Sequence, residues 1–289
     1  MRFKNSLFII LILSLLNNAL SAQENPAYQL YNEKGKAVDY GKMLKKLTEA
    51  DIVFFGELHD NPICHWLQLE LSQDLYEARD SQLILGAEFF ETDDQLILDE
   101  FLSGLISEKN FEKEAKLWPN YSTDYRPLIQ FANEKQLPFI ATNVPRRYAS
   151  LLYKKGMETL EKLNNEAKAL MTPLPFEIDM ELPSYKAMLE MGAGHGSEQM
   201  VQAQALKDAT MAHFILENFE PQKLFLHFNG AYHSNSKEGI IWYLLQENPD
   251  LKIVNIASVM QESVMELEEG NQALGDFILC IPENMTRTH

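Results

Sequence analysis

The amino-acid sequence predicts an α/β fold with a mostly parallel central sheet, flanking helices and a helical insertion over the carboxyl edge of the sheet. Six short apolar runs have the pattern of buried strands, and helical segments separate most of them. Strands in that arrangement pair in parallel through right-handed crossovers. Several of these runs also end in a polar residue able to do chemistry. In a parallel sheet such residues line one edge, where ligands usually bind.

Residues 1–22 have the pattern of a secretory signal peptide. Two basic residues precede an apolar stretch from Leu7 to Leu16, and the small pair Ser21-Ala22 offers a cleavage site. We therefore expect residues 23–289 to form one exported domain, periplasmic or associated with the cell surface. A bacterial lipoprotein would carry a cysteine just after the apolar stretch, and the first cysteine is Cys64.

The chain is strongly acidic, with a net charge of −17. Cleavage after Ala22 removes Arg2 and Lys4 but no acid, so 42 acids then face 23 bases, a net charge of −19. Nucleic acids and anionic membranes bind basic surfaces, so neither is expected as a partner. Two cysteines imply no disulfide framework. Cys64 and Cys280 are expected to be buried free thiols, with a single bridge as the alternative in an oxidising compartment.

Strands and helices alternate along the chain. The first helix is expected to begin at Pro62, because Asp60 or Asn61 can cap it and proline suits the first helical position. The last strand follows an acidic turn and is open to antiparallel pairing at an edge. Strands are expected at residues 52–55, 83–89, 138–142, 224–229, 252–257 and 276–281. Further helices are expected at 94–102, 126–135, 146–155, 198–217 and 239–246.

Residues 157–199 break this alternation. They contain Pro173, Pro175 and Pro183, end in a glycine-rich run around His195, and offer no strand pattern. We interpret them as a helical insertion over the sheet edge, able to act as a lid.

The candidate chemistry lies where the strands end. Glu57 and His59 leave the first strand, Glu88 leaves the second, and His233 leaves the fourth, with a glycine three residues before each histidine. Any one of these residues is more often a helix cap or a satisfied polar group than a ligand. Together, two imidazoles and two carboxylates at one sheet edge would suit a divalent metal or an acid/base pair.

Arg146 stands at the start of a predicted helix, where a cation is unfavourable unless an anion is bound there. It is therefore a candidate to hold a carboxylate or phosphate, and the alternative is a buried ion pair with Glu88 or Glu57. Asp208 lies between apolar positions of a helix and points either inward or to solvent. Three of the remaining histidines are expected to be packing or core residues (His65, His213, His227), and His289 is a chain end. His195 is expected to belong to a turn, with a mobile ligand as the alternative.

Five segments in this order resemble the ChaN family of haem-binding, iron-regulated proteins. The family belongs with the erythromycin-esterase-like and TIKI proteins, whose shared mark is a pair of Gly-x-x-His motifs. The resemblance extends from about Ile52 to Ser258 and implies haem or iron handling outside the cytoplasm. The segments are Gly56-Glu57-Leu58-His59-Asp60, Gly86-Ala87-Glu88, Asn143-Val144-Pro145-Arg146, the stretch 204–212 and Gly230-Ala231-Tyr232-His233.

The resemblance also implies which residues form the site. Members of the superfamily would use the residues that correspond to Glu57, His59, Glu88, Arg146 and His233, and Asp208 is typical of the family's helix. Asn143 and Tyr232 lie in the same motifs and are candidate ligand-binding residues. ChaN proteins are described as lipoproteins, and this chain departs from them in lacking the lipidation cysteine.

The favoured function is an exported haem-binding protein in haem and iron uptake. A haem site needs an axial donor, apolar walls and cations for the propionates. A second copy of the chain and an outer-membrane haem receptor are candidate partners. The absence of Cys-x-x-Cys-His excludes covalent haem. Candidate donors are Tyr121, Tyr125, Tyr185 and Tyr232, candidate walls are Met188, Met191, Met200 and Met211, and candidate cations are Arg146 and Arg147, although tyrosine and methionine usually fill cores.

The alternative function is a metal-dependent hydrolase. In it, His59 and His233 hold Mn or Zn together with Glu57 or Glu88, and a metal-bound water attacks an ester or amide. A third possibility is a structural domain whose strands simply end in polar residues.

Overall fold

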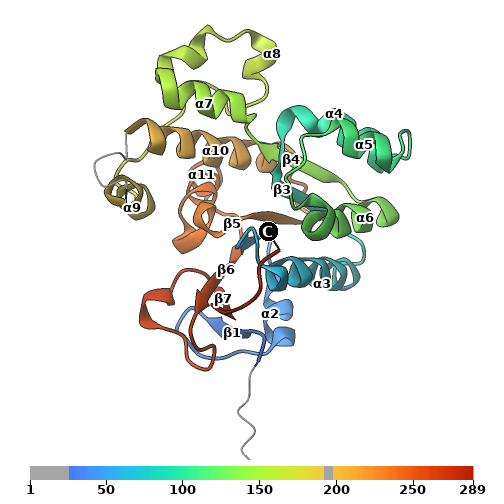
Figure 1. Cartoon of the computed structure of the whole chain (residues 1–289), viewed down its shortest axis with the longest axis vertical. Helices are drawn as coiled ribbons and strands as arrows, with labels where there is room; N and C mark the ends of the chain where they lie inside the picture. Colours follow the sequence, from blue (N-terminus) through green and yellow to red (C-terminus); the bar gives the residue numbers. More distant parts are fainter. Residues whose placement is uncertain (1–25, 192–197, 289) are drawn as a thin grey trace, which may run out of the picture.

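The computed structural model describes residues 26–191 and 198–288. Seven strands form one sheet in the order β1-β7-β6-β2-β5-β3-β4 (Figure 1). Every neighbouring pair is parallel except β1 with β7. The predicted α/β class and mostly parallel sheet are therefore confirmed. The strands are β1 (Gln29–Asn32), β2 (Ile52–Glu57), β3 (Leu83–Glu91), β4 (Phe139–Asn143), β5 (Leu224–Gly230), β6 (Ile253–Gln261) and β7 (Phe277–Pro282).

The six predicted strands are all present, and β1 is an additional one. The expectation for the last strand is only partly right, because β7 pairs in parallel with β6 and it is β1 that closes the edge in antiparallel register. The predicted signal peptide and His195 lie outside the described residues. Within those residues, no helix is both long and apolar enough to cross a membrane.

Helices cover both faces of the sheet because the central strands are apolar on both faces. On β2, Val53 and Phe55 pack against one group of helices, and Ile52 and Phe54 pack against the other. The first group is α2 (Tyr40–Leu47), α3 (Pro62–Ala78), α4 (Gln95–Leu102), α5 (Glu108–Glu114) and α6 (Arg126–Lys135). The second includes α10 (Glu198–Glu217) and α11 (Ile240–Glu247), with α7 (Arg146–Lys155) beside α10.

Local sequence signals fix several of these helix ends. Asn61 caps α3, since its side-chain oxygen accepts hydrogen bonds from the amides of Ile63, at 3.0 Å, and Cys64. The bounds of α6, α7 and α10 agree with those predicted from the sequence. Cys64 on α3 and Cys280 on β7 are buried free thiols, as expected.

The described part of the insertion contains no strand. It consists of a 3₁₀ segment (Met157–Lys162), α8 (Asn165–Lys168) and α9 (Pro183–Met191). Leu160 and Met171 pack with α7, and Tyr185 packs against α10. The insertion thus thickens the helical layer around α10. It reaches the carboxyl edge where the Ser184 carbonyl accepts a hydrogen bond from the Tyr232 hydroxyl at 3.2 Å. Its action as a lid stays a prediction.

The two edges of the sheet are closed differently. β1 covers β7, whereas the outer side of β4 is met by a side chain from α4. The amide nitrogen of Gln95 donates to the Phe139 carbonyl at 3.0 Å, and its oxygen accepts from the Ala141 amide at 2.6 Å. One glutamine thereby takes the hydrogen bonds that a further strand would make.

Gly239 is predicted to be indispensable to the turn that follows His233. Its φ is +54°, and an added Cβ would lie 2.3 Å from the His233 carbonyl oxygen. Gly239→Ala should therefore lower the free energy of unfolding by about 2–4 kcal/mol, measured by urea denaturation.

Gly41→Ala is the matched control. Nothing lies within 4 Å of a Cβ at Gly41, which sits in α2. Alanine is the better helix former by about 1 kcal/mol, so this variant should be as stable as the wild type or slightly more so. Equal stability of the two variants would contradict the assigned strain.

Candidate functional site

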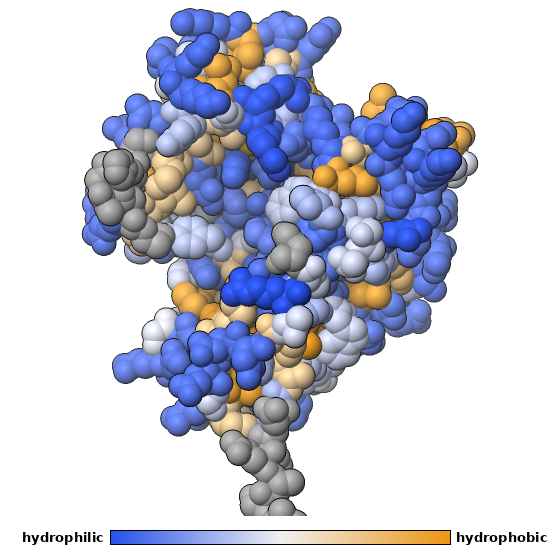
Figure 2. Space-filling view, viewed as in Figure 1, coloured by the Kyte–Doolittle hydropathy of each residue, from blue (hydrophilic) through white to orange (hydrophobic). Residues whose placement is uncertain are grey.

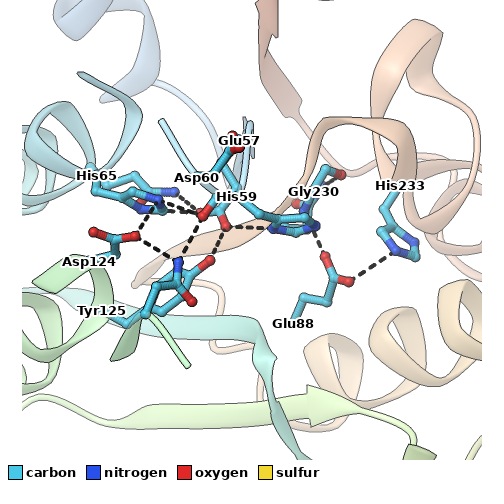
Figure 3. A network of polar contacts seen from close by, with 12 residues as sticks. Glu57, His59, Asp60, His65, Glu88, Asp124, Tyr125, Gly230 and His233 are labelled. Carbon is cyan, nitrogen blue, oxygen red and sulfur yellow. Dashed lines mark hydrogen bonds and ion pairs between the residues drawn. The ribbon is translucent and has the colours of Figure 1, made fainter. Parts of the chain in front are cut away.

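A cleft of about 760 Å³ opens at the carboxyl edge of the sheet. The four strand-end residues predicted to converge, Glu57, His59, Glu88 and His233, all line it, and so does Tyr232. Glu88 lies between His59 and His233 in Figure 3. The sheet order explains the convergence, because β5 lies between β2 and β3 and brings His233 beside the ends of both.

One half of the site is built around Glu57, the last residue of β2. Its buried carboxylate accepts a hydrogen bond from the Tyr125 hydroxyl at 2.6 Å and another from the Gln68 side-chain amide. The same carboxylate lies 2.9 Å from Nδ1 of His59. Burial by itself would raise the pKa of Glu57, but His59, His65 and Tyr125 together lower it.

His59 is held by this carboxylate and by an aromatic neighbour. Its ring meets Trp118 edge-on, with centroids 4.9 Å apart. Burial would lower the pKa of His59, but Glu57 and Glu88 outweigh it and raise the pKa. His65, expected to be a packing residue, contacts the main chain of His59, and its Nε2 lies 3.1 Å from the His59 carbonyl oxygen.

The other half of the site is built around Glu88. The register of β3 against β4 shifts between Ala87 and Glu91. At this shift the side-chain amide of Asn143 donates to the main-chain carbonyl of Glu88 at 3.0 Å. The Glu88 carboxylate accepts from the Gly230 amide at 2.6 Å and lies 3.2 Å from Nε2 of His233.

Asp208 completes this half from α10. It is buried, as one of its two predicted orientations requires, and its carboxylate contacts Nδ1 of His233. The Tyr185 hydroxyl also donates to it, at 2.9 Å. Both ring nitrogens of His233 therefore face carboxylates, an arrangement that favours the imidazolium form.

The charges of this cluster follow from its geometry. Burial would lower the pKa of His233, but Glu88 and Asp208 outweigh it and raise the pKa to about 10. For Glu88, burial would raise the pKa, but His233, His59 and the Gly230 amide lower it well below the usual range. For Asp208, burial dominates over His233 and the pKa is raised.

Gly230 joins the two halves. A Cβ at this position would lie 2.6 Å from Nε2 of His59, which is too close for any residue other than glycine unless the His59 ring moved. A glycine three residues before His233 thus lets the β5 main chain pass directly beside the His59 ring while its amide binds Glu88. Glycine permits so close an approach because it has no Cβ.

Arg146 does not form the buried ion pair that was one of the two expectations for it. Its side chain is 80% exposed, and its nearest acid is Glu91, at 3.9 Å. A buried ion pair with Glu88 or Glu57 is therefore wrong. The physical reason is that other groups already satisfy those acids. Gly230 and His233 contact the Glu88 carboxylate, and the Glu57 carboxylate is held by Gln68, Tyr125 and His59. Arg146 lies instead in a neighbouring pocket with Lys116, Trp118 and Arg147. An anion-binding role for it stays a prediction.

The four candidate haem-donor tyrosines have different surroundings. Tyr125 and Tyr185 are buried, and their hydroxyls donate to Glu57 and Asp208. Tyr121 is buried away from the cleft, within the main core. Tyr232 lines the cleft and is 41% exposed. Of the methionines, Met188 and Met211 pack in apolar clusters. The side chain of Met191 lies outside the described residues, and Met200 does not line the described cleft.

The predicted divalent-metal site stays a prediction. Among the residues that the structure describes, no group of three or more His, Cys, Asp or Glu side chains is placed to hold a metal ion. The donors are already engaged: His233 faces carboxylates with both nitrogens, and the oxygens of Glu57 and Glu88 accept hydrogen bonds.

Sequence reasoning missed the supporting residues. Gln68 and Tyr125 hold Glu57, Tyr185 holds Asp208, and Gln204 lies 3.0 Å from Nδ1 of His233. Gln204 opens one of the segments on which the family resemblance depends, and that was the available signal for it. From the sequence, Tyr125 and Tyr185 are candidates only as haem donors, and Gln68 stands inside a helical pattern whose polar face does not indicate where it points.

The fold and the site together define a class of protein. An α/β sheet whose carboxyl edge carries two Gly-x-x-His segments, each histidine beside a buried carboxylate, has the shared mark of the Tiki superfamily. A family model described as "Haem-binding uptake, Tiki superfamily, ChaN" matches residues 43–244. The chain belongs to this ChaN family.

Three solved structures are similar to this chain, and the first of them shares its fold. A structure described as cofacial heme binding to ChaN of Campylobacter jejuni has a TM-score of 0.67 at 20% identity, over 89% of this chain and 98% of that chain. The type III effector HopBA1 has a TM-score of 0.48 at 11% identity, over 90% and 100%. An erythromycin esterase mutant in its open conformation has 0.47 at 10% identity, over 89% and 83%. No curated protein matches the chain.

His233 is predicted to stay protonated at pH 8. Its folded pKa of about 10 exceeds the unfolded value near 6.5, so its stabilising contribution is complete below pH 6.5 and is lost as pH rises through 10. Histidine-ring ¹⁵N NMR should show both nitrogens of His233 protonated at pH 8, and Asp208→Asn should lower this pKa.

His227 is the internal comparison. It is a buried core histidine, as expected, and burial lowers its pKa to about 4. Its ring should therefore be neutral in the same spectrum. A neutral His233 ring at pH 8 would contradict the assigned charge cluster.

Proposed function

We propose that this chain is an exported haem-binding protein of haem and iron uptake, with haem held in the cleft at the carboxyl edge. Membership of the haem-binding uptake family supports haem as the ligand. The observation that carries the placement is Tyr232. Of the four candidate tyrosines, it alone combines a position on the cleft with an exposed side chain.

The residues that line the cleft suit the three requirements of haem. Tyr232 offers the phenol oxygen, and Leu58, Ala231 and Met260 offer apolar surface. Lys207 and Arg287 offer positive charge for the propionates. Haem would supply a ferric iron that can accept an oxygen donor from the protein. Burial, together with Glu238, raises the pKa of Tyr232, so its phenol is protonated at neutral pH.

The charge cluster beneath the cleft then acts as a support. Glu88 holds the Gly230 amide and His233, and these two residues flank Ala231 and Tyr232 in the chain. The Tyr232 hydroxyl is oriented further by the Ser184 carbonyl of α9. We infer that Glu88, His233 and Asp208 pre-position the tyrosine rather than bind the ligand themselves.

Export is supported by the signal-peptide pattern of residues 1–22. Hydrophilic residues cover most of the face seen in Figure 2, which agrees with transport through an aqueous compartment. A cleft open to solvent would allow transfer of the ligand to a receptor, or sharing with a second copy of the chain.

Tyr232→Phe is predicted to abolish haemin binding through the phenol oxygen. Titration of the purified chain with haemin should give a saturable shift of the Soret band, and the variant should lose that shift because phenylalanine has no donor oxygen. Tyr153→Phe is the matched control, since Tyr153 is 47% exposed on α7 and does not line the cleft.

Two results would contradict the proposal. One is an unchanged Soret spectrum in Tyr232→Phe. The other is a failure of the wild type to take up haemin, combined with stoichiometric Mn or Zn in the untreated protein that disappears when His59 and His233 are both changed. The second result would favour the hydrolase.

Lys207 is predicted to bind a propionate. Among the described residues it makes no ion pair, whereas Arg287 is held by Asp60 at 2.8 Å. Lys207→Gln should weaken haemin binding about five-fold, measured by fluorescence quenching. Arg146→Gln should have a smaller effect, and the reverse order would assign the propionates to the Arg146 pocket.

A further inference from the structure

A second pocket, of about 370 Å³, shares no lining residue with the cleft of the proposed haem site. It lies between residues 172–177 of the insertion, residues 209–216 in the second half of α10, and residues 242–247 of α11. Pockets that bind small molecules typically have volumes of about 300–1,000 Å³. This one could therefore enclose a small ligand.

Three aromatic rings form one corner of this pocket. Phe176 comes from the insertion, and Trp242 and Tyr243 come from α11. The Trp242 and Tyr243 rings stand at 87° with centroids 4.8 Å apart, and the Phe176 and Tyr243 rings are tilted by 58° at 6.4 Å. The rings thus present differently oriented surfaces to one volume.

A hydrogen bond holds the aromatic corner in place, and small side chains leave space beside it. The Tyr243 hydroxyl donates to the Glu177 carbonyl at 2.9 Å, which ties α11 to the insertion. The neighbouring lining residues of α10 are Ala209 and Ala212, both buried. Because alanine is short, the space above this part of α10 stays unfilled.

The charges around the pocket are negative. Glu177 and Glu247 line it and are exposed, and neither makes an ion pair among the described residues. No Lys or Arg of the described chain lines the pocket. The only basic side chain there is His213, whose Nε2 lies 3.4 Å from Glu217, so a charge on it would be compensated.

We propose that this pocket binds a small organic cation, a quaternary or protonated amine with an apolar body. The apolar body packs against Phe176, Trp242 and Tyr243, and the positive charge interacts with the aromatic rings and with the rim carboxylates. Cations bind aromatic rings in this way when water is partly excluded. Two uncompensated carboxylates would oppose binding of an anion of the same size.

The test uses the full chain and three probes of similar size but different charge: benzyltrimethylammonium, benzyl alcohol and benzoate. Isothermal titration calorimetry should show saturable binding of the cation, about ten-fold tighter than that of benzyl alcohol, with benzoate the weakest. The indole N–H signal of Trp242 should shift in the NMR spectrum with the cation.

Charge-removing variants locate the effect. The double variant Glu177→Gln and Glu247→Gln should bind the cation at least about five-fold more weakly, while its binding of benzyl alcohol stays the same. Glu262→Gln, an exposed acid that does not line the pocket, is the control and should behave as the wild type. Trp242→Ala should lose binding of the cation, with a thermal melt to confirm that the variant folds.

Three outcomes would overturn the proposal. They are no saturable binding of the cation in the millimolar range, equal affinity for the cation and for benzyl alcohol, and binding of the cation that the double glutamine variant leaves unchanged. The glutamine variants preserve side-chain shape, so the last comparison decides even if Trp242→Ala fails to fold. None of these outcomes bears on haem binding at Tyr232.

Discussion

The buried carboxylate of Glu88 is the constraint on which the carboxyl edge depends. It receives the Gly230 amide from β5 and faces the His233 ring, which is compensated on its other side by Asp208 from α10. A buried ion is tolerated only when its partners and hydrogen bonds repay the loss of water. Here one acid ties β3 to β5 and, through His233, to α10, and removal of His233 would leave two buried carboxylates without the cation between them.

Much of the fold could be predicted because each central strand repeats the same signal. A short apolar run bounded by polar residues was sufficient for β2 to β7, and the Asn61-Pro62 cap located the start of α3. β1 gave no such signal, since Gln29–Asn32 is short and has only two buried side chains. Its pairing with β7 depends on contacts between the two ends of the described chain, which local patterns do not encode.

The site was predictable only where side chains follow strands. Strand order and direction forced Glu57, Glu88 and His233 to one edge, so a rule about sheets was sufficient. What these groups do there depends on their partners, which come from helices: Tyr125 and Gln68 for Glu57, Asp208 and Gln204 for His233. Those partners turn a set of potential metal ligands into a closed hydrogen-bonded network. Arg146 also follows a strand, but no side chain of the network contacts it, and it remains exposed to solvent.

The side chain of Gln95 has a consequence for assembly. Its side-chain amide forms hydrogen bonds with the main chain of Phe139 and Ala141 on β4, an edge strand of the sheet. An unprotected strand there would offer a template for another polypeptide, and proteins commonly block such borders. Because the Gln95 side chain already uses these hydrogen-bonding groups of β4, two copies could not join by pairing their β4 strands into one continuous sheet. Any pairing of two molecules would have to use other surfaces, and the carboxyl edge with its cleft is then free to be one of them.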